Sequence, residues 1–148
     1  MKVRPGDVLR AHSPPNLAGR ATLSYVAKGE PRPNITSKYT GSRVKYFELV
    51  SAYVGCGEAM TGALPIDNSD LPVVQVPQPC TILFSGVNST GGVISQTCSF
   101  SGTRDMQQCF FGKNFTSAVA VNVEVKTAAS LPLVTSFLLD DVVHINHY

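Results

Sequence analysis

Hydrophobic and polar positions alternate most strictly between Ala118 and Lys126. Valines occupy every second position from Val119 to Val125, and small, polar or charged residues lie between them. Successive side chains of a β-strand point to opposite faces, so this pattern predicts a strand with one buried face and one solvated face. Such half-exposed strands are typical of antiparallel sheets.

A second hydrophobic segment closes the chain, from Phe137 to Tyr148. It contains no Gly or Pro and is too short for a membrane span, which favours a long, largely buried strand. A buried strand needs a neighbour on each side. We therefore expect the earlier strands to form the sheets that this segment completes.

The other periodic segments also favour strands. Arg43 to Cys56 is rich in β-branched and aromatic residues, and Arg20 to Ala27 is a weaker candidate. Cys80 to Val87 and Gly92 to Phe100 flank a short turn that contains Gly, which predicts a β-hairpin. Because no segment shows helical periodicity, we predict an all-β fold, an antiparallel β-sandwich.

Segments rich in Pro, Gly and polar residues connect these strands. We predict loops at Gly29 to Ser42, Gly57 to Pro79 and Ser101 to Thr116. Residues 1–16 are interpreted as an extended entry segment and residues 17–148 as a single domain. The entry segment has no apolar core of the kind found in signal peptides, so we expect a truncated start.

Four cysteines lie in the middle of the chain, at Cys56, Cys80, Cys98 and Cys109. None forms a CxxC pair and the histidines do not complete a zinc-finger spacing, so two disulfides are favoured over metal ligands or free thiols. Of the three possible connectivities, pairing sequence neighbours closes the shortest loops. This predicts Cys56–Cys80 and Cys98–Cys109, each within a single loop region.

N-glycosylation sequons begin at Asn34, Asn88 and Asn114, in or beside predicted loops. Together with the disulfides they indicate a secreted eukaryotic glycoprotein, extracellular or in the cell wall. The net charge of +2 is scattered along the chain, whereas nucleic-acid binding requires a concentrated basic face. We therefore expect no nucleic-acid partner, and the absence of a long apolar stretch predicts no membrane partner.

Four segments resemble a fungal secreted β-sandwich domain of the galactose-binding-like kind. They are Ser13-Pro14-Pro15-Asn16, Tyr46 to Cys56, Pro79 to Gly86 and Phe137 to Val142. The resemblance covers about residues 13–148 at the level of pattern, and Leu138-Leu139-Asp140-Asp141-Val142 is its most typical part. It implies a jelly-roll-like sandwich that binds carbohydrate, although likeness of fold supports a fold more than a function.

Candidate ligand-binding residues are those that combine an aromatic face with polar neighbours. We select Tyr53, Phe110 and Phe111, with Asp70 from the long loop; Tyr25 and Tyr39 are also available. Phe110 and Phe111 are adjacent, so both cannot point into one core. Packing across a loop is the alternative interpretation of this pair.

One candidate metal site lies in the segment Asp67-Asn68-Ser69-Asp70. Its oxygen-bearing side chains suit Ca²⁺, with Asp67 and Asp70 as ligands, but it lacks the Gly and the distal Glu of an EF-hand. An Asx turn is the alternative. On the last strand, Asp140 and His144 would stand about 13 Å apart, too far to share an ion.

Three functional hypotheses follow. The first is a non-catalytic module that binds carbohydrate or cell-wall glycan through its loops. The second is a structural or interaction protein with an extracellular protein partner, which includes a homodimer formed through an exposed sheet edge. The third is a polysaccharide hydrolase or lyase, but no Gly-x-Ser-x-Gly motif is present and nothing selects two carboxylates. We therefore assign no catalytic residue.

Overall fold

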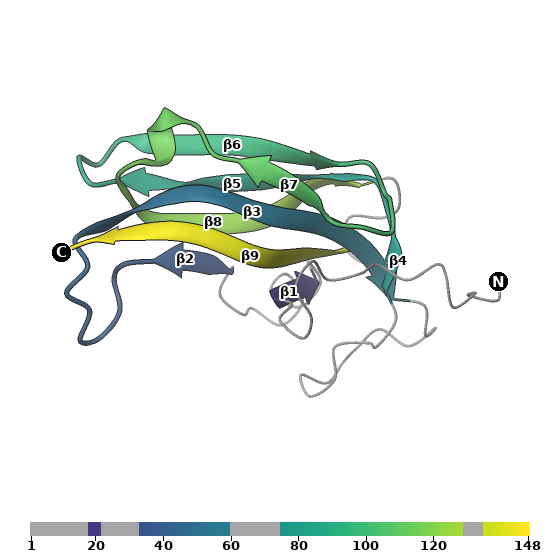
Figure 1. Ribbon diagram of the computed structural model, residues 1–148, viewed down its shortest axis with the longest axis horizontal. Helices are drawn as coiled ribbons and strands as arrows, with labels where there is room; N and C mark the ends of the chain where they lie inside the picture. The colour runs from purple at the N-terminus through teal and green to yellow at the C-terminus, as the bar shows by residue number, and fades with distance from the viewer. Residues whose placement is uncertain (1–17, 22–32, 60–74, 129–134) are drawn as a thin grey trace.

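The computed structural model describes residues 18–21, 33–59, 75–128 and 135–148, and most of them lie in antiparallel strands (Figure 1). The strands are β1 (Ala18–Ala21), β2 (Asn34–Thr36), β3 (Tyr46–Ala59), β4 (Gln75–Pro77), β5 (Cys80–Asn88), β6 (Val93–Phe100), β7 (Gln107–Phe110), β8 (Ala118–Ala128) and β9 (Thr135–His147). A short 3₁₀ helix, η1 (Lys113–Phe115), precedes β8. The prediction of an all-β, antiparallel fold is confirmed.

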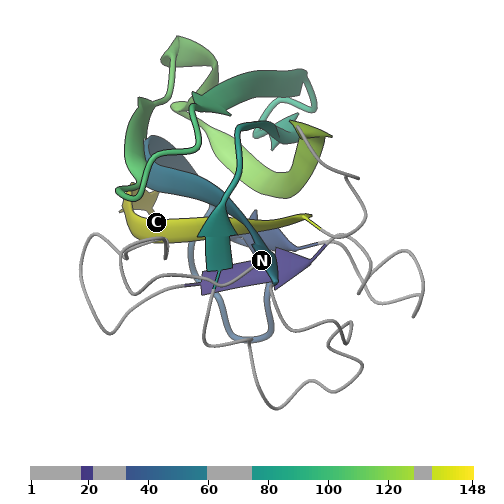
Figure 2. The ribbon, with the colours of Figure 1, turned by 90° about the vertical axis from the view of Figure 1, so that its right-hand side faces the viewer.

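The strands form two layers that face each other. Their order is β1-β9-β3-β8-β5-β6, with β2 added to β8 and with β4 and β7 added to β3. Within the described residues, the backbone pairing of β3 with β8 is limited to Phe47 and Ala118. Beyond that pair the same edge of β3 bonds to β7 and then to β4, so the sheet folds over on itself. Figure 2 shows β5, β6 and β8 above β9 and β1, an arrangement consistent with the predicted sandwich.

The core lies between these layers. It is built from inward-facing side chains of β3, β5, β6, β8 and β9, among them Phe47, Leu49, Ile82 and Phe84. The valine alternation on β8 behaves as predicted at three of its four positions, since Val121, Val123 and Val125 are buried and Val119 is half-buried. Alternation along a half-buried strand therefore identified the core face of β8.

Both predicted cysteine pairs are present, but their predicted location in loops is wrong. Cys56 on β3 is bonded to Cys80 on β5, and Cys98 on β6 is bonded to Cys109 on β7. Neither pair of strands is hydrogen-bonded together. Each disulfide therefore joins two strands that are not neighbours in the sheet and fixes one layer to the other.

Three predicted loops contain strands. Strand β2 lies in the predicted loop 29–42, β4 in the predicted loop 57–79, and β7 in the predicted loop 101–116. Each is only three or four residues long and pairs with a strand distant in sequence. Because such strands are stabilised by their partners, local periodicity does not reveal them. Of the predicted strand Arg20 to Ala27, residues 22–27 lie outside the described residues.

Strand β9 is buried only in its first half. Residues Thr135 to Asp140 are buried, whereas most residues from Asp141 onward are exposed, so the prediction of a largely buried strand is wrong for the second half. Asp141 has a φ of 42°, and the register with β3 shifts around Ser51. This irregularity is a β-bulge, and it changes which side chains point inward.

Asn88 stabilises the turn of the predicted β5–β6 hairpin, which is confirmed. Its Oδ1 accepts hydrogen bonds from the Thr90 amide at 3.1 Å, the Thr90 hydroxyl at 2.8 Å and the Gly92 amide at 2.8 Å. We expect Asn88→Ala to lower the free energy of unfolding by about 1–2 kcal/mol, because these bonds are lost in a partly exposed turn. Urea denaturation of unglycosylated protein measures this loss.

The matched control is Asn114→Ala, which removes an exposed asparagine of η1 from another sequon. We expect this substitution to change stability by less than about 0.5 kcal/mol. An equal loss in the two variants would show that the side-chain bonds of Asn88 do not stabilise the turn.

Candidate functional site

Strand pairing brings Tyr53 and Phe110 to one surface. Phe110 lies opposite Ser51, and Gln108 lies opposite Tyr53. Residues directly opposite each other in an antiparallel pair project to the same face. The alternate position on β3, Ala52, is buried in the core, so these four side chains lie on the opposite face of the strands. On that face Ser51 is buried, and Tyr53 is half-buried and packs against the edge of the core. Tyr53 and Phe110 are diagonal neighbours, about 7 Å apart at their backbones.

Strand β9 extends this surface on the other side of β3. Val143 pairs with Ser51, and Asp140 pairs with Tyr53. Nearer the C-terminus, Ile145 pairs with Glu48 and His147 pairs with Tyr46. The term "outer face" is used below for the side chains of Phe110, Gln108, Tyr46, Glu48, Ser51, Tyr53, Asp140, Val143, Ile145 and His147.

The outer face combines exposed apolar surface with polar groups. Phe110 is 66% exposed, and Val143 and Ile145 are 48% and 49% exposed. The ring of Tyr46 stacks on His147 with centroids 4.6 Å apart and an interplanar angle of 17°. Asp140 is buried, with its Oδ1 accepting a hydrogen bond from the Asp141 amide at 2.8 Å.

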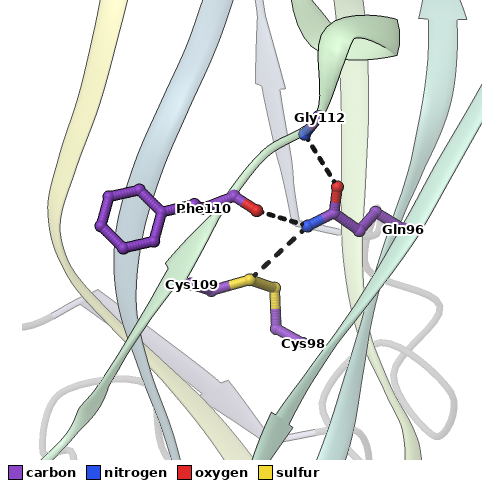
Figure 3. The surroundings of a disulfide bond; sticks show 5 residues. All are labelled: Gln96, Cys98, Cys109, Phe110 and Gly112. Atoms are coloured by element: carbon purple, nitrogen blue, oxygen red, sulfur yellow. Dashed lines mark hydrogen bonds between the residues drawn. A yellow bond between two sulfur atoms is a disulfide. The ribbon is translucent and has the colours of Figure 1, made fainter.

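The backbone around Phe110 is held on several sides (Figure 3). Cys109, immediately before it, forms the disulfide to Cys98. The side-chain amide of Gln96 donates to the Phe110 carbonyl at 2.7 Å and accepts from the Gly112 amide at 3.0 Å. In Figure 3 the Phe110 ring points away from both Gln96 and the disulfide. An exposed ring is thus presented on a fixed support, which limits the entropy lost on binding.

Phe111 points the other way, into the core. Its ring meets Phe84 edge-on at 4.8 Å and lies 5.1 Å from the ring of Phe115. The two adjacent phenylalanines therefore have different roles. Phe111 packs between the layers, and Phe110 alone belongs to the outer face.

The remaining predicted site residues do not join this surface. Asp67 and Asp70 lie outside the described residues. Within the described ranges, no group of three or more His, Cys, Asp or Glu side chains is arranged to hold a metal ion. The sequon residues lie on β2, at the end of β5 and in η1, so none of them belongs to the outer face. Asn34 and Asn114 are exposed, and Asn88 is half-buried.

Sequence reasoning missed the contributions of Gln108, Tyr46, Val143 and Ile145. Tyr46 and Glu48 follow the two-residue period of a strand, which was a usable signal. Gln108 and Phe110 follow the same period, but β7 had been predicted as a loop. The two β9 residues could be oriented only once the bulge at Asp141 was known.

Comparison of the chain with protein-family models, curated proteins and solved structures finds no match. Among the described residues, no helix is long and apolar enough to cross a membrane.

Proposed function

We propose that the protein is a secreted, non-catalytic module that binds carbohydrate through the outer face. The observation that carries this proposal is Phe110, an aromatic side chain that is 66% exposed although its backbone is firmly held. Leaving a large apolar side chain in water gives up the free energy of its burial, about 2 kcal/mol for Phe. Phe111 already fills the core beside it, so packing does not explain the position of Phe110.

The chemistry of the outer face suits a sugar. A pyranose ring has an apolar C–H surface that stacks on an aromatic ring, and hydroxyl groups that bond to polar neighbours. Phe110, Tyr53 and the stacked Tyr46 supply aromatic rings, while Gln108 and Glu48 supply hydrogen-bonding groups between them. A few polar groups set among apolar and aromatic surface are typical of small-ligand sites.

The setting of this face supports an extracellular role. Two disulfides are typical of proteins from oxidising compartments. Glycans attached at Asn34, Asn88 or Asn114 would start from elements other than β3, β7 and β9, and would leave the face accessible. The resemblance to galactose-binding-like domains implies the same class of ligand.

An extracellular protein partner is the second candidate. Val143 and Ile145 are about half exposed at neighbouring outward positions of β9. Exposed aliphatic side chains grouped beside aromatic ones are typical of protein interfaces. A second copy of this chain falls within the same class and would reveal itself as a concentration-dependent dimer in size-exclusion chromatography.

We expect Phe110→Ala to weaken glycan binding about tenfold or more, because truncating a central aromatic contact costs over 1 kcal/mol. The measurement is a glycan array with the oxidised wild type, followed by calorimetric titration of the best ligand into both proteins. Phe110→Tyr should retain binding, since the ring remains.

Val93→Ala is the matched control, because Val93 is 85% exposed on β6 and is not part of the outer face. We expect this control to bind as the wild type does. A blank array with folded protein would rule out the glycan proposal and favour the protein partner. Undiminished binding by Phe110→Ala would rule out this face as the glycan site.

A further inference from the structure

A cavity of about 110 Å³ lies at the C-terminal end of β9, away from the outer face. One wall is formed by His144 and Asn146 of β9, and the other by Thr36 of β2 and by Tyr39. Phe47 also lines it and belongs to the core. The cavity thus opens between the two layers, at the edge where β9 and β2 approach each other.

The two β9 residues lie on the strand face that is turned toward the core, but both side chains remain exposed. Asn146 lies opposite Phe47, and His144 lies opposite Leu49, and both of these partners are buried. Earlier inward positions of β9, such as Leu139 and Val142, are apolar and pack in the core. On this face of β9 the residues change from apolar to polar at His144, where the cavity begins. In the described part of the chain, neither His144 nor Asn146 makes a side-chain hydrogen bond to another residue.

The opposite wall is fixed by its own hydrogen bonds. The Ser37 hydroxyl donates to the Val119 carbonyl at 3.3 Å, and the Thr36 hydroxyl accepts from the Lys38 amide at 2.9 Å. Tyr39 begins a tight turn closed by a bond from the Ser42 amide to its carbonyl at 3.0 Å. Its side chain is 61% exposed at the cavity. The polar side chains at the cavity that are still available to bond a ligand are therefore mainly those of His144 and Asn146.

The segment that forms this wall is basic. Residues 36–45 contain Lys38, Arg43 and Lys45, all exposed, and no Asp or Glu. Residues 1–10 carry as many cations, but with Asp7 among them, so the segment 36–45 is distinguished by three cations without an acidic residue. On β9 the nearest acidic residue is Asp141, three positions before His144, and Glu48 lies on the outer face. Three nearby cations without an acidic neighbour in the segment attract a single anionic group.

We propose that this cavity binds the acidic group of an anionic sugar. Its volume is below the range of about 300–1,000 Å³ for pockets that enclose a whole ligand, so it suits one carboxylate or sulfate group. The Asn146 amide and the His144 ring donate hydrogen bonds to the anionic oxygens, and the sugar ring remains outside near Tyr39. The sugar part of this inference rests on the proposed function, whereas the location and the anionic selectivity do not.

The test is calorimetric titration of the oxidised protein with three matched trisaccharides. These probes are galacturonic acid trisaccharide, the neutral galactose trisaccharide and its sulfated form. We expect an acidic trisaccharide to bind at least tenfold more tightly than the neutral one, and to weaken severalfold between about 50 mM and about 500 mM salt. Binding of only one acidic form supports the proposal and identifies the acidic group.

Variants then assign the acidic ligand to the cavity. Asn146→Ala and His144→Ala should each weaken acidic binding about tenfold, as expected for hydrogen bonds to a charged group. Arg43→Ala should weaken it more than Arg104→Ala, which removes an exposed cation from the β6–β7 connection, at the other end of the sheet in Figure 1.

Equal affinity for neutral and acidic sugars would overturn this inference, as would acidic binding unaffected by Asn146→Ala. If acidic binding is lost in Phe110→Ala but kept in Asn146→Ala, the anion binds at the outer face. That result overturns the cavity proposal and leaves the proposed function standing.

Discussion

Replacing Cys56 and Cys80 together by Ala is expected to lower the free energy of unfolding by about 4 kcal/mol. The bridge spans a sequence separation of 24 residues, for which loop-closure entropy in the unfolded chain accounts for about 3.5 kcal/mol. Both cysteines are also buried, at 0% and 7% exposure, so the substitution removes packed atoms from between the layers. Urea denaturation of the oxidised proteins measures the difference.

The second disulfide provides the comparison. Cys98–Cys109 spans 11 residues, and Cys109 is only half-buried, so the double Ala variant at this bridge should lose about 3 kcal/mol or less. Its removal should instead affect the position of Phe110, the next residue along β7. A larger stability loss at Cys98–Cys109 than at Cys56–Cys80 would contradict this account of the core.

The strands that sequence analysis found are those whose pattern is local. The valines of β8, the hairpin β5–β6 and the cysteine pairing could all be predicted from spacing. Strand β7 could not, because Gln107 to Phe110 contains two glutamines and no alternation of apolar and polar residues. What makes it a strand is pairing with β3 and the bond from Cys109 to Cys98, both set by the tertiary fold.

Part of the candidate site was also predictable. Tyr53 and Phe110 were selected from composition, but their neighbours depend on register. On β3 the core-facing residues change from Phe47 and Leu49 to Ala52 and Val54, because the register with β9 shifts between them. A shift of one residue exchanges the two faces of a strand. The sequence carries no clear mark of this shift, so a strict alternation would have assigned Tyr53 to the core face.

Gly86→Ala is expected to cost about 3–5 kcal/mol, because it forces two central strands apart. A Cβ at this position would lie 1.8 Å from the Ala120 carbonyl oxygen and 2.9 Å from the Val121 Cα, and both are backbone atoms of β8. No side-chain rotation relieves such an overlap, so β8 must move or its pairing with β5 must break. Thermal and urea unfolding measure the loss.

Gly112→Ala is the control for this substitution. A Cβ there would come no closer than 3.7 Å to the Gln96 side-chain oxygen, and the φ of −79° is accessible to any residue. We expect a change within about 0.5 kcal/mol.

A loss below about 1 kcal/mol for Gly86→Ala would mean that β8 shifts easily. That shift would affect the cavity before the outer face, because β2 pairs with β8 at Ala120 and Val121, whereas β7 and β9 pair with β3.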